Sequence, residues 1–165
     1  MKRAAKKGFT LVEILIVVII LGILAAIVIP QFTEASAEAR VSSVMTNLQT
    51  IRSQLLLYKT QHKEIYPGST SDAAVFGNQM TQYTNADGGV NATPAATHPY
   101  GPYLQSVPAN PISGSKVVRV VNSAATTFTA PAADAGWWFN MATGEFRADL
   151  VAARVTTDGT LINTL

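Results

Sequence analysis

The chain has 165 residues, no cysteine, and twelve Lys or Arg against ten Asp or Glu, which gives a formal net charge of +2. Its length suits one globular domain with an additional segment. The lack of cysteine excludes disulfides and cysteine-ligated metal sites. The basic residues beyond position 8 are scattered, so no nucleic acid partner is expected.

An apolar run follows a short basic segment at the N-terminus. Residues 1–7 hold four of the Lys and Arg residues, and between positions 9 and 32 the only charged residue is Glu13. A helical run of this length can cross the ~30 Å hydrocarbon core of a bilayer, so lipid is an expected partner. Since basic residues stay on the cytoplasmic side of a span, the rest of the chain is expected outside the cytoplasm. Without the basic segment, eight basic and ten acidic residues leave a net charge of −2.

The start of the chain differs from an ordinary secretory signal, which has small residues directly after its apolar core. The nearest candidate, residues 24–26, reads Leu-Ala-Ala, and the apolar run continues beyond it to Ile29. A better cleavage point is the bond between Gly8 and Phe9. Cutting there would remove the basic segment and leave the apolar helix on the mature protein.

Residues 7–13 read Lys-Gly-Phe-Thr-Leu-Val-Glu and lead into the apolar run. This pattern resembles the N-terminus of type IV pilin-like proteins, a family that includes type IV pilins and the pseudopilins of type II secretion. The resemblance implies cleavage after Gly8 by a prepilin peptidase and N-methylation of Phe9 by a methyltransferase. It also implies an inner-membrane precursor, an inner-membrane assembly platform and assembly into a helical homopolymer. A generic single-pass anchor is the alternative, but it would need neither Glu13 nor a glycine before Phe9.

Glu13 lies inside the apolar run, just over one helical turn after Phe9. A carboxylate there is costly in a membrane, although proximity to the helix N-terminus relieves part of the cost. Cleavage at Gly8 would create an amine on Phe9. Glu13 of an assembled subunit could attract that amine on an incoming subunit and so set the axial register. The family resemblance implies the same role.

The helix is predicted to run from about Phe9 to Gln61, because apolar residues recur at spacings of three and four. Its later apolar face consists of Val41, Val44, Leu48, Ile51, Leu55 and Tyr58. Such a helix would be roughly 80 Å long, so its first half is expected to protrude from a domain of ordinary size. Gly22 and Pro30 predict a kink in that half. The sequence at residues 66–68, Tyr-Pro-Gly, is expected to end the helix.

The remainder predicts an α+β domain. A short helix is expected over residues 71–83, capped by Ser71 or Asp72, followed by an ordered loop over 85–111. Strands are expected at 116–121, 126–129, 136–140 and 145–150, with a hairpin over 155–162. In the strand at 145–150, Glu145, Arg147 and Asp149 are expected to point outward. Trp137 and Trp138 are expected to place one ring in the core and one against the helix, rather than to form an exposed patch.

The predicted fold is therefore a long kinked N-terminal α-helix, its first half membrane-spanning, packed on a small antiparallel β-sheet. The predicted regions are a cleaved leader at 1–8, a transmembrane and assembly helix at 9–32, and a pilin-like globular domain at 33–165. Within the domain, several segments resemble the major pseudopilins and related bacterial pilins. These segments are residues 54–59, 66–67, 101–104, 108–111 and 136–145. Many Gram-negative pilins close a C-terminal loop with a disulfide, so something else must hold that part here.

Sites for catalysis or metal binding are not apparent. His62 is interpreted as a solvated residue at the helix end and His98 as a loop residue, and no catalytic motif accompanies them. No enzymatic activity is therefore expected. Asn85, Asp87 and Asn91 place oxygen ligands around glycines, and major pseudopilins often bind calcium. The segment lacks the bidentate acid of a calcium-binding hand, so a plain turn without a metal is preferred.

The leading functional hypothesis is a structural subunit that polymerises through its N-terminal helix. Both a type IV pilus at the cell surface and a type II secretion pseudopilus in the periplasm fit the sequence. The alternatives are a membrane-anchored extracytoplasmic binding module that does not polymerise, and an anchored extracellular enzyme. The Gly8–Phe9 bond and Glu13 favour the filament subunit.

Overall fold

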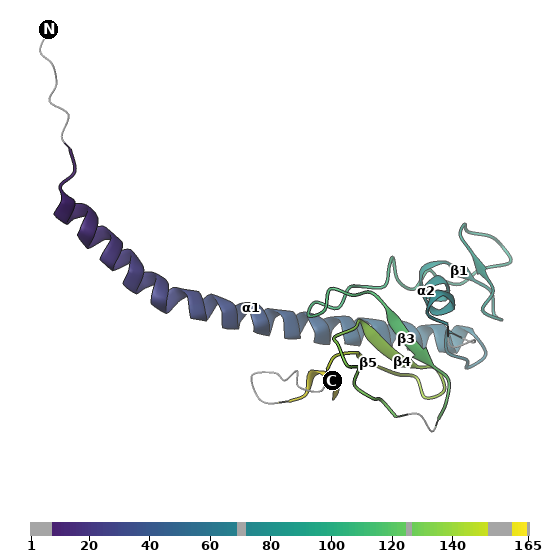
Figure 1. The fold of residues 1–165 in the computed structure, drawn as a ribbon. Coiled ribbons are helices and arrows are strands. Elements are labelled where there is room, and N and C mark those ends of the chain that lie inside the picture. Colours follow the sequence, from purple (N-terminus) through teal and green to yellow (C-terminus); the bar gives the residue numbers. More distant parts are fainter. Residues whose placement is uncertain (1–7, 69–71, 125–126, 152–159, 165) are drawn as a thin grey trace, which may run out of the picture. The chain divides into compact units, whose positions relative to one another are not determined.

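The computed structural model describes residues 8–68, 72–124, 127–151 and 160–164. The chain divides into two compact units, residues 1–38 and residues 39–165. Helix α1 (Leu11–Gln61) begins in the first unit and ends in the second (Figure 1). The other elements are α2 (Ala73–Thr81), β1 (Tyr83–Thr84), β2 (Val90–Asn91), β3 (Val118–Val121), β4 (Trp137–Asn140), β5 (Glu145–Ala148) and the 3-10 helix η1 (Ile162–Thr164).

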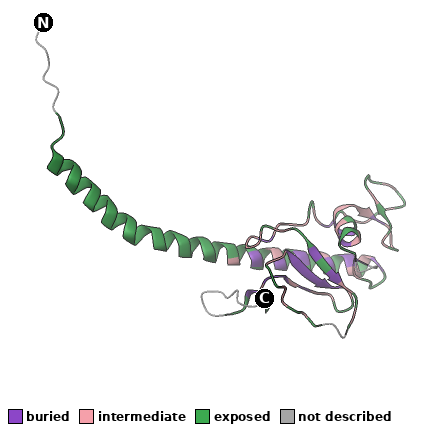
Figure 2. Ribbon diagram, viewed as in Figure 1, coloured by how far each residue is buried: buried purple, intermediate pink, exposed green. Residues whose placement is uncertain are grey.

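The first unit consists of the N-terminal part of α1 and the residues before it. Each of its described residues is exposed (Figure 2). By length and composition α1 could cross a membrane, and none of its most apolar 18-residue window is buried. The helix continues without interruption through Gly22 and Pro30. A kink at these residues stays a prediction.

The second unit is built on the C-terminal part of α1. The apolar face predicted from the sequence is confirmed, since five of its six members are buried and Val41 packs against them. The five are Val44, Leu48, Ile51, Leu55 and Tyr58. They share one core with Phe76 and Met80 of α2 and with the inward residues of the sheet, such as Phe139 and Phe146. The helix and β5 are also joined by Arg52, whose Nε and Nη2 donate to the Phe146 carbonyl at 3.1 and 2.7 Å.

The three-stranded sheet has the order β3-β4-β5. Strands β4 and β5 form the predicted antiparallel pair, with Phe139 opposite Phe146. Strands β3 and β4 are parallel, with Val118 opposite Trp137. The α+β class is confirmed, but the sheet is mixed rather than wholly antiparallel. The connection over residues 122–136 is long enough to allow this parallel pairing.

One predicted strand is absent from the structure, and one predicted hairpin is only partly described. Residues 127–129 form no strand, so the expected antiparallel partner of β3 is missing there. The hairpin predicted over 155–162 lies mainly outside the described residues. Its last position, Ile162, begins the 3-10 helix η1.

The adjacent tryptophans of β4 are both fully buried, which excludes the exposed patch. Trp137 belongs to the core and lies 5.6 Å from Phe146 between ring centroids. Trp138 meets Phe128 edge-on at 5.5 Å. The second ring is therefore covered by the segment after β3, and not by the helix as expected.

Asp149 was expected to point outward, but only 1% of its surface is exposed. The Asp149 backbone still pairs with Ala135 and Gly136, so the alternation continues and its side chain lies on the face of Arg119 and Trp138, which is covered at this point. The Asp149 carboxylate accepts two hydrogen bonds from Arg119 of β3, at 3.0 and 2.6 Å. Arg119 also donates to the carbonyl of Thr129 at 2.9 Å. This ion pair ties β3 to the chain after β5 in a protein without disulfides.

Helix α1 ends at Gln61, as predicted, and the Tyr-Pro-Gly sequence at residues 66–68 follows a few residues later. Lys63 and Glu64 have left-handed backbone φ angles of 55° and 63°, which no longer fit a helix. Tyr66 then packs on the β4–β5 turn at Gly144, where φ is 81°. A β-carbon added to Gly144 would lie 2.2 Å from the Tyr66 ring, so this turn requires glycine.

Candidate processing and assembly segment

The residues expected to be processed lie before the first turn of α1. Gly8, Phe9 and Thr10 have no regular secondary structure, and 83% of the Phe9 surface is exposed. A β-carbon added to Gly8 would meet nothing within 4 Å. The described part of the fold therefore gives no reason for glycine at position 8, and a requirement for glycine can come from a partner.

Thr10 and Glu13 form a capping box at the start of α1. The Glu13 backbone N–H donates to Thr10 Oγ1 at 3.2 Å. In return, Glu13 Oε2 accepts from the Thr10 backbone N–H and from Thr10 Oγ1, both at 2.8 Å. The first backbone N–H groups of a helix have no acceptor within the helix, and the pattern Thr-x-x-Glu supplies side-chain acceptors for them. The sequence interpretation missed this role, although the spacing of Thr10 and Glu13 signals it.

The capping box fixes where the Glu13 carboxylate lies. Its Oε2 is held within the first turn of α1, near the backbone of Thr10. No described residue donates a hydrogen bond to Oε1. A carboxylate oxygen can accept further donors, so an amine could still bind there. The geometry thus places an acceptor close in sequence to the Phe9 position at which cleavage would create an amine.

The suggested calcium ligands are engaged in other ways. Asn85 Oδ1 accepts from the backbone N–H groups of Asp87 and Gly89 at 3.0 and 2.8 Å, which forms a local turn. The Asp87 carboxylate pairs with Lys63. Asn91 lies in β2 opposite Tyr83. Among the described residues no three His, Asp or Glu side chains are grouped to hold a metal. The expectation of no bound metal stays a prediction.

The interpretation of His62 as a solvated residue is wrong, because only 2% of its surface is exposed. Its Nδ1 lies 2.8 Å from the Tyr58 carbonyl and its Nε2 lies 2.9 Å from Thr84 Oγ1. The helix ends one residue earlier, so the ring can turn back onto the last helical turn. Burial lowers the pKa of His62, and the nearby carbonyls of Tyr58 and Asn85 oppose this effect.

Comparisons with known proteins agree with the N-terminal pattern. Residues 3–29 match the prokaryotic N-terminal methylation motif. The type IV major fimbrial protein FimA of Dichelobacter nodosus is 40% identical over 100 residues, covering 55% of this chain and 64% of that protein. The type II secretion system core protein G of Pseudomonas aeruginosa is 34% identical over 114 residues, covering 66% of this chain and 78% of that protein. A fimbrial protein of Pseudomonas aeruginosa is 36% identical over 84 residues, covering 51% of this chain and 54% of that protein.

The chain spans less than two thirds of the two fimbrial proteins and more than three quarters of core protein G. No solved structure matches the chain. An exposed apolar N-terminal helix with a methylation motif, joined to a small α+β domain, defines a pilin-type subunit. The chain belongs to the type IV pilin-like family.

Proposed function

We propose that the chain is a structural, non-enzymatic subunit of a type IV pilus or a type II secretion pseudopilus. It is inserted in the inner membrane as a single-pass precursor with its N-terminus in the cytoplasm, and it polymerises through α1. The observation that carries this proposal is the methylation motif over residues 3–29, placed directly on the exposed apolar part of α1. An exposed apolar helix needs lipid or other helices around it, and a filament subunit meets both in turn.

The leader at residues 1–8 is cut by a prepilin peptidase between Gly8 and Phe9, and the new N-terminus is methylated. The open surroundings of Gly8 support this step, since a protease can approach a backbone that none of the described residues covers. Residues 9–32 then form the membrane and assembly helix, and residues 33–165 form the extracytoplasmic domain. The partners are further copies of the chain, the peptidase and methyltransferase, the inner-membrane assembly platform and the bilayer.

Glu13 sets the axial register in the filament by attracting the Phe9 amine of the incoming subunit. Apolar side chains slide past one another with little preference, whereas a charge pair in an apolar surrounding favours one spacing. The acceptor position left open on Glu13 Oε1 supports this role.

The experiment expresses the full chain with a prepilin peptidase and an assembly platform. Intact mass should show loss of residues 1–8 and one added methyl group, and electron microscopy should show filaments. The variant Glu13→Ala should be inserted and cleaved but should assemble poorly on its own. Glu34→Ala is the matched control, since Glu34 is also exposed on α1 but lies beyond the apolar run.

Normal filaments from Glu13→Ala alone would remove the register role. A chain that keeps residues 1–8, or that is cleaved but never polymerises, would favour a membrane-anchored binding module instead. Loss of surface filaments in a deletion strain would identify a pilus, and loss of protein secretion would identify a pseudopilus.

A further inference from the structure

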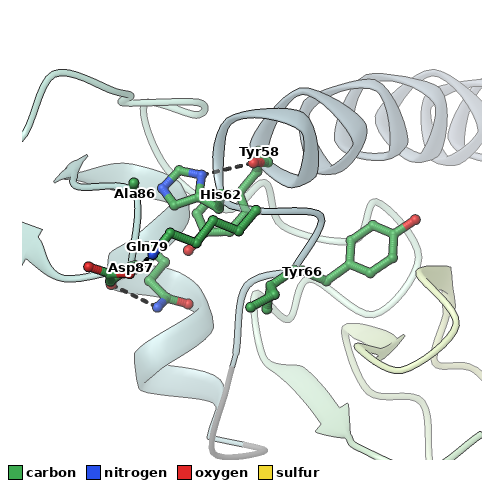
Figure 3. Close-up of a pocket in the computed structure, with 9 residues that line it drawn as sticks. Tyr58, His62, Tyr66, Gln79, Ala86 and Asp87 are labelled. Carbon is green, nitrogen blue, oxygen red and sulfur yellow. Dashed lines mark hydrogen bonds and ion pairs between the residues drawn. The ribbon is translucent and has the colours of Figure 1, made fainter.

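A buried polar cluster joins the end of α1 to the chain after α2. The His62 ring stacks on Tyr58 with ring centroids 3.7 Å apart and an interplanar angle of 3°. Tyr100 and Tyr103 meet the same imidazole edge-on at 5.4 and 6.0 Å. In Figure 3 the imidazole lies between the end of α1 and the loop that carries Ala86 and Asp87. Thr84, its hydrogen-bond partner, is completely buried.

The hydrogen bonds of this cluster fit a neutral imidazole. A carbonyl oxygen can only accept, so the Nδ1 beside the Tyr58 carbonyl carries a hydrogen. The neutral ring then has an acceptor at Nε2, which takes the hydrogen of the Thr84 hydroxyl. A second proton would turn Nε2 into a donor, so the buried Thr84 hydroxyl could no longer donate to it and would have to find another acceptor, a cost that the nearby Asn85 carbonyl offsets only in part.

The described charged and titratable groups around His62 do not offset the positive charge that a second proton would bring. Burial raises the pKa of Tyr58 and of Tyr103, so both phenols stay neutral. The carboxylate that shares a cavity wall with His62 is Asp87, and it is already paired with Lys63. This pair is exposed to solvent, with 64% and 74% of the two side chains accessible. An imidazolium would therefore be buried among aromatic rings without an anionic partner of its own.

Protons can reach the cluster through a cavity. A cavity of about 90 Å³ lies beside the end of α1, and Tyr58, His62, Gln79 and Asp87 are among its lining residues. That volume is large enough for water molecules, so a proton can be delivered to the cavity wall that His62 helps to form. Gly88 keeps this space open, because an added β-carbon would lie 3.0 Å from the Tyr58 hydroxyl and 2.8 Å from Gln79 Nε2.

Other contacts also hold the segment over residues 83–104 to the helices, among them a hydrogen bond from Gln79 Nε2 of α2 to the Gly88 carbonyl at 2.9 Å. The Tyr103 hydroxyl donates to Gln61 Oε1 at 2.6 Å. The backbone N–H groups of Tyr103 and Leu104 donate to the Met80 carbonyl at 3.0 and 2.8 Å. Thr84 and Tyr100 exchange two backbone hydrogen bonds, at 2.9 and 3.1 Å, within the segment. Because Thr84 is bonded to Tyr100, loss of the His62–Thr84 contact would loosen both the stretch around Thr84 and the stretch around Tyr100.

We propose that His62 is an acid-sensitive latch, which holds residues 83–104 on the end of α1 at neutral pH and releases them when the imidazole binds a proton. Release adds one proton and breaks the contact with Thr84, and no covalent bond changes. Because we place this domain outside the cytoplasm, the acidity of the surroundings would act on the latch directly. The latch at His62 does not depend on cleavage of the leader or on polymerisation of the chain.

The test measures hydrogen exchange by mass spectrometry on the full chain in detergent micelles, at about pH 7.5 and about pH 5, which bracket the ordinary titration of histidine. Rates are corrected for the intrinsic effect of pH on exchange. Peptides from residues 83–104 should exchange faster at acid pH, by about tenfold for each unit by which the His62 pKa is lowered. Peptides from residues 137–148, in β4 and β5, should change less.

The variant His62→Asn removes the titrating group and should abolish the acid response. His98→Asn is the matched control, because His98 is the only other histidine and its Nδ1 lies beside the Thr97 hydroxyl in the exposed loop. This control should keep the full response. A response that survives in His62→Asn, or that spreads equally to residues 137–148, would overturn the proposal.

A second measurement does not depend on a folded variant. With only two histidines, the chain labelled at the imidazole carbons gives two resolvable titrations by NMR. The His62 titration should fall below the ordinary value of about 6.5 and coincide with the midpoint of the exchange response. A His62 pKa at or above that value, or a midpoint that follows His98, would refute the latch.

Discussion

The ion pair between Arg119 and Asp149 offers a sharp test of how the C-terminal part is held without a disulfide. The two side chains differ in exposure, since 41% of the Arg119 side chain is accessible but only 2% of the Asp149 side chain is. Breaking a fully buried pair costs about 3–5 kcal/mol, because one charge is left without its partner. The loss of stability therefore depends on how exposed the remaining charge is, and the two single variants should differ in their free energy of unfolding.

In Asp149→Asn, the partner left behind is Arg119, whose guanidinium can reach water and still donates to the Thr129 carbonyl. We expect a loss of about 2–3 kcal/mol in the free energy of unfolding, in the range of hydrogen bonds to charged groups. In Arg119→Met, the carboxylate left behind is buried, so the loss should be larger, at about 3–5 kcal/mol. For a domain of this size these losses correspond to a decrease in Tm of roughly 5–20 °C.

The assay is thermal unfolding of the full chain in detergent, followed by tryptophan fluorescence. Trp138 is a suitable reporter, because it pairs with Arg119 in the neighbouring strand. Lys63→Met breaks the exposed pair with Asp87 and is the control, since exposed ion pairs contribute little. Equal losses in the two Arg119–Asp149 variants, or a loss no larger than that of the control, would refute the reasoning.

Three further predictions concern the core, a turn and the pH response. Leu48→Ala should reduce the free energy of unfolding by about 2–5 kcal/mol, because Leu48 is buried in the core, and a chemical denaturation series that shows no change would contradict this burial. Gly144→Ala should lower Tm by more than Gly77→Ala, since only Gly144 has a left-handed φ and faces the Tyr66 ring, whereas nothing lies within 4 Å of a β-carbon at Gly77. Burial lowers the pKa of His62 in the folded chain, so as the pH falls His62 binds a proton in the unfolded chain first. The free energy of unfolding should therefore be at its full value above about pH 6.5 and decrease below that pH. It should become constant again below the pKa of His62 in the folded chain. His62→Asn should flatten this part of the stability curve, and an unchanged curve would count against the burial of a neutral imidazole.

Much of the fold could be predicted where the signal is local. The three-and-four spacing of apolar residues predicted the buried face of α1, and its C-terminal boundary at Gln61 agrees with the structure. The short helix α2 and its cap were also confirmed, with Asp72 Oδ1 accepting from the Ala74 N–H at 2.7 Å. These features depend on neighbours within a few residues, which a sequence pattern records directly.

The features that escaped prediction depend on distant parts of the chain. The parallel pairing of β3 and β4 and the burial of Asp149 result from contacts across the sheet. His62 is buried because Thr84 and the tyrosine rings lie beside it, which its position after a helix could not reveal. The capping box at Thr10 is the exception, since its signal is local and was present in the sequence.

The same capping box has a consequence for maturation. Both of its members, Thr10 and Glu13, lie after the proposed cut between Gly8 and Phe9. Removal of the leader therefore leaves both members of the capping box in place, and the helix can start at the same residue in precursor and product. On this view, processing changes the charge at the end of the helix, from several cations to a single amine, while the conformation that presents it is already in place.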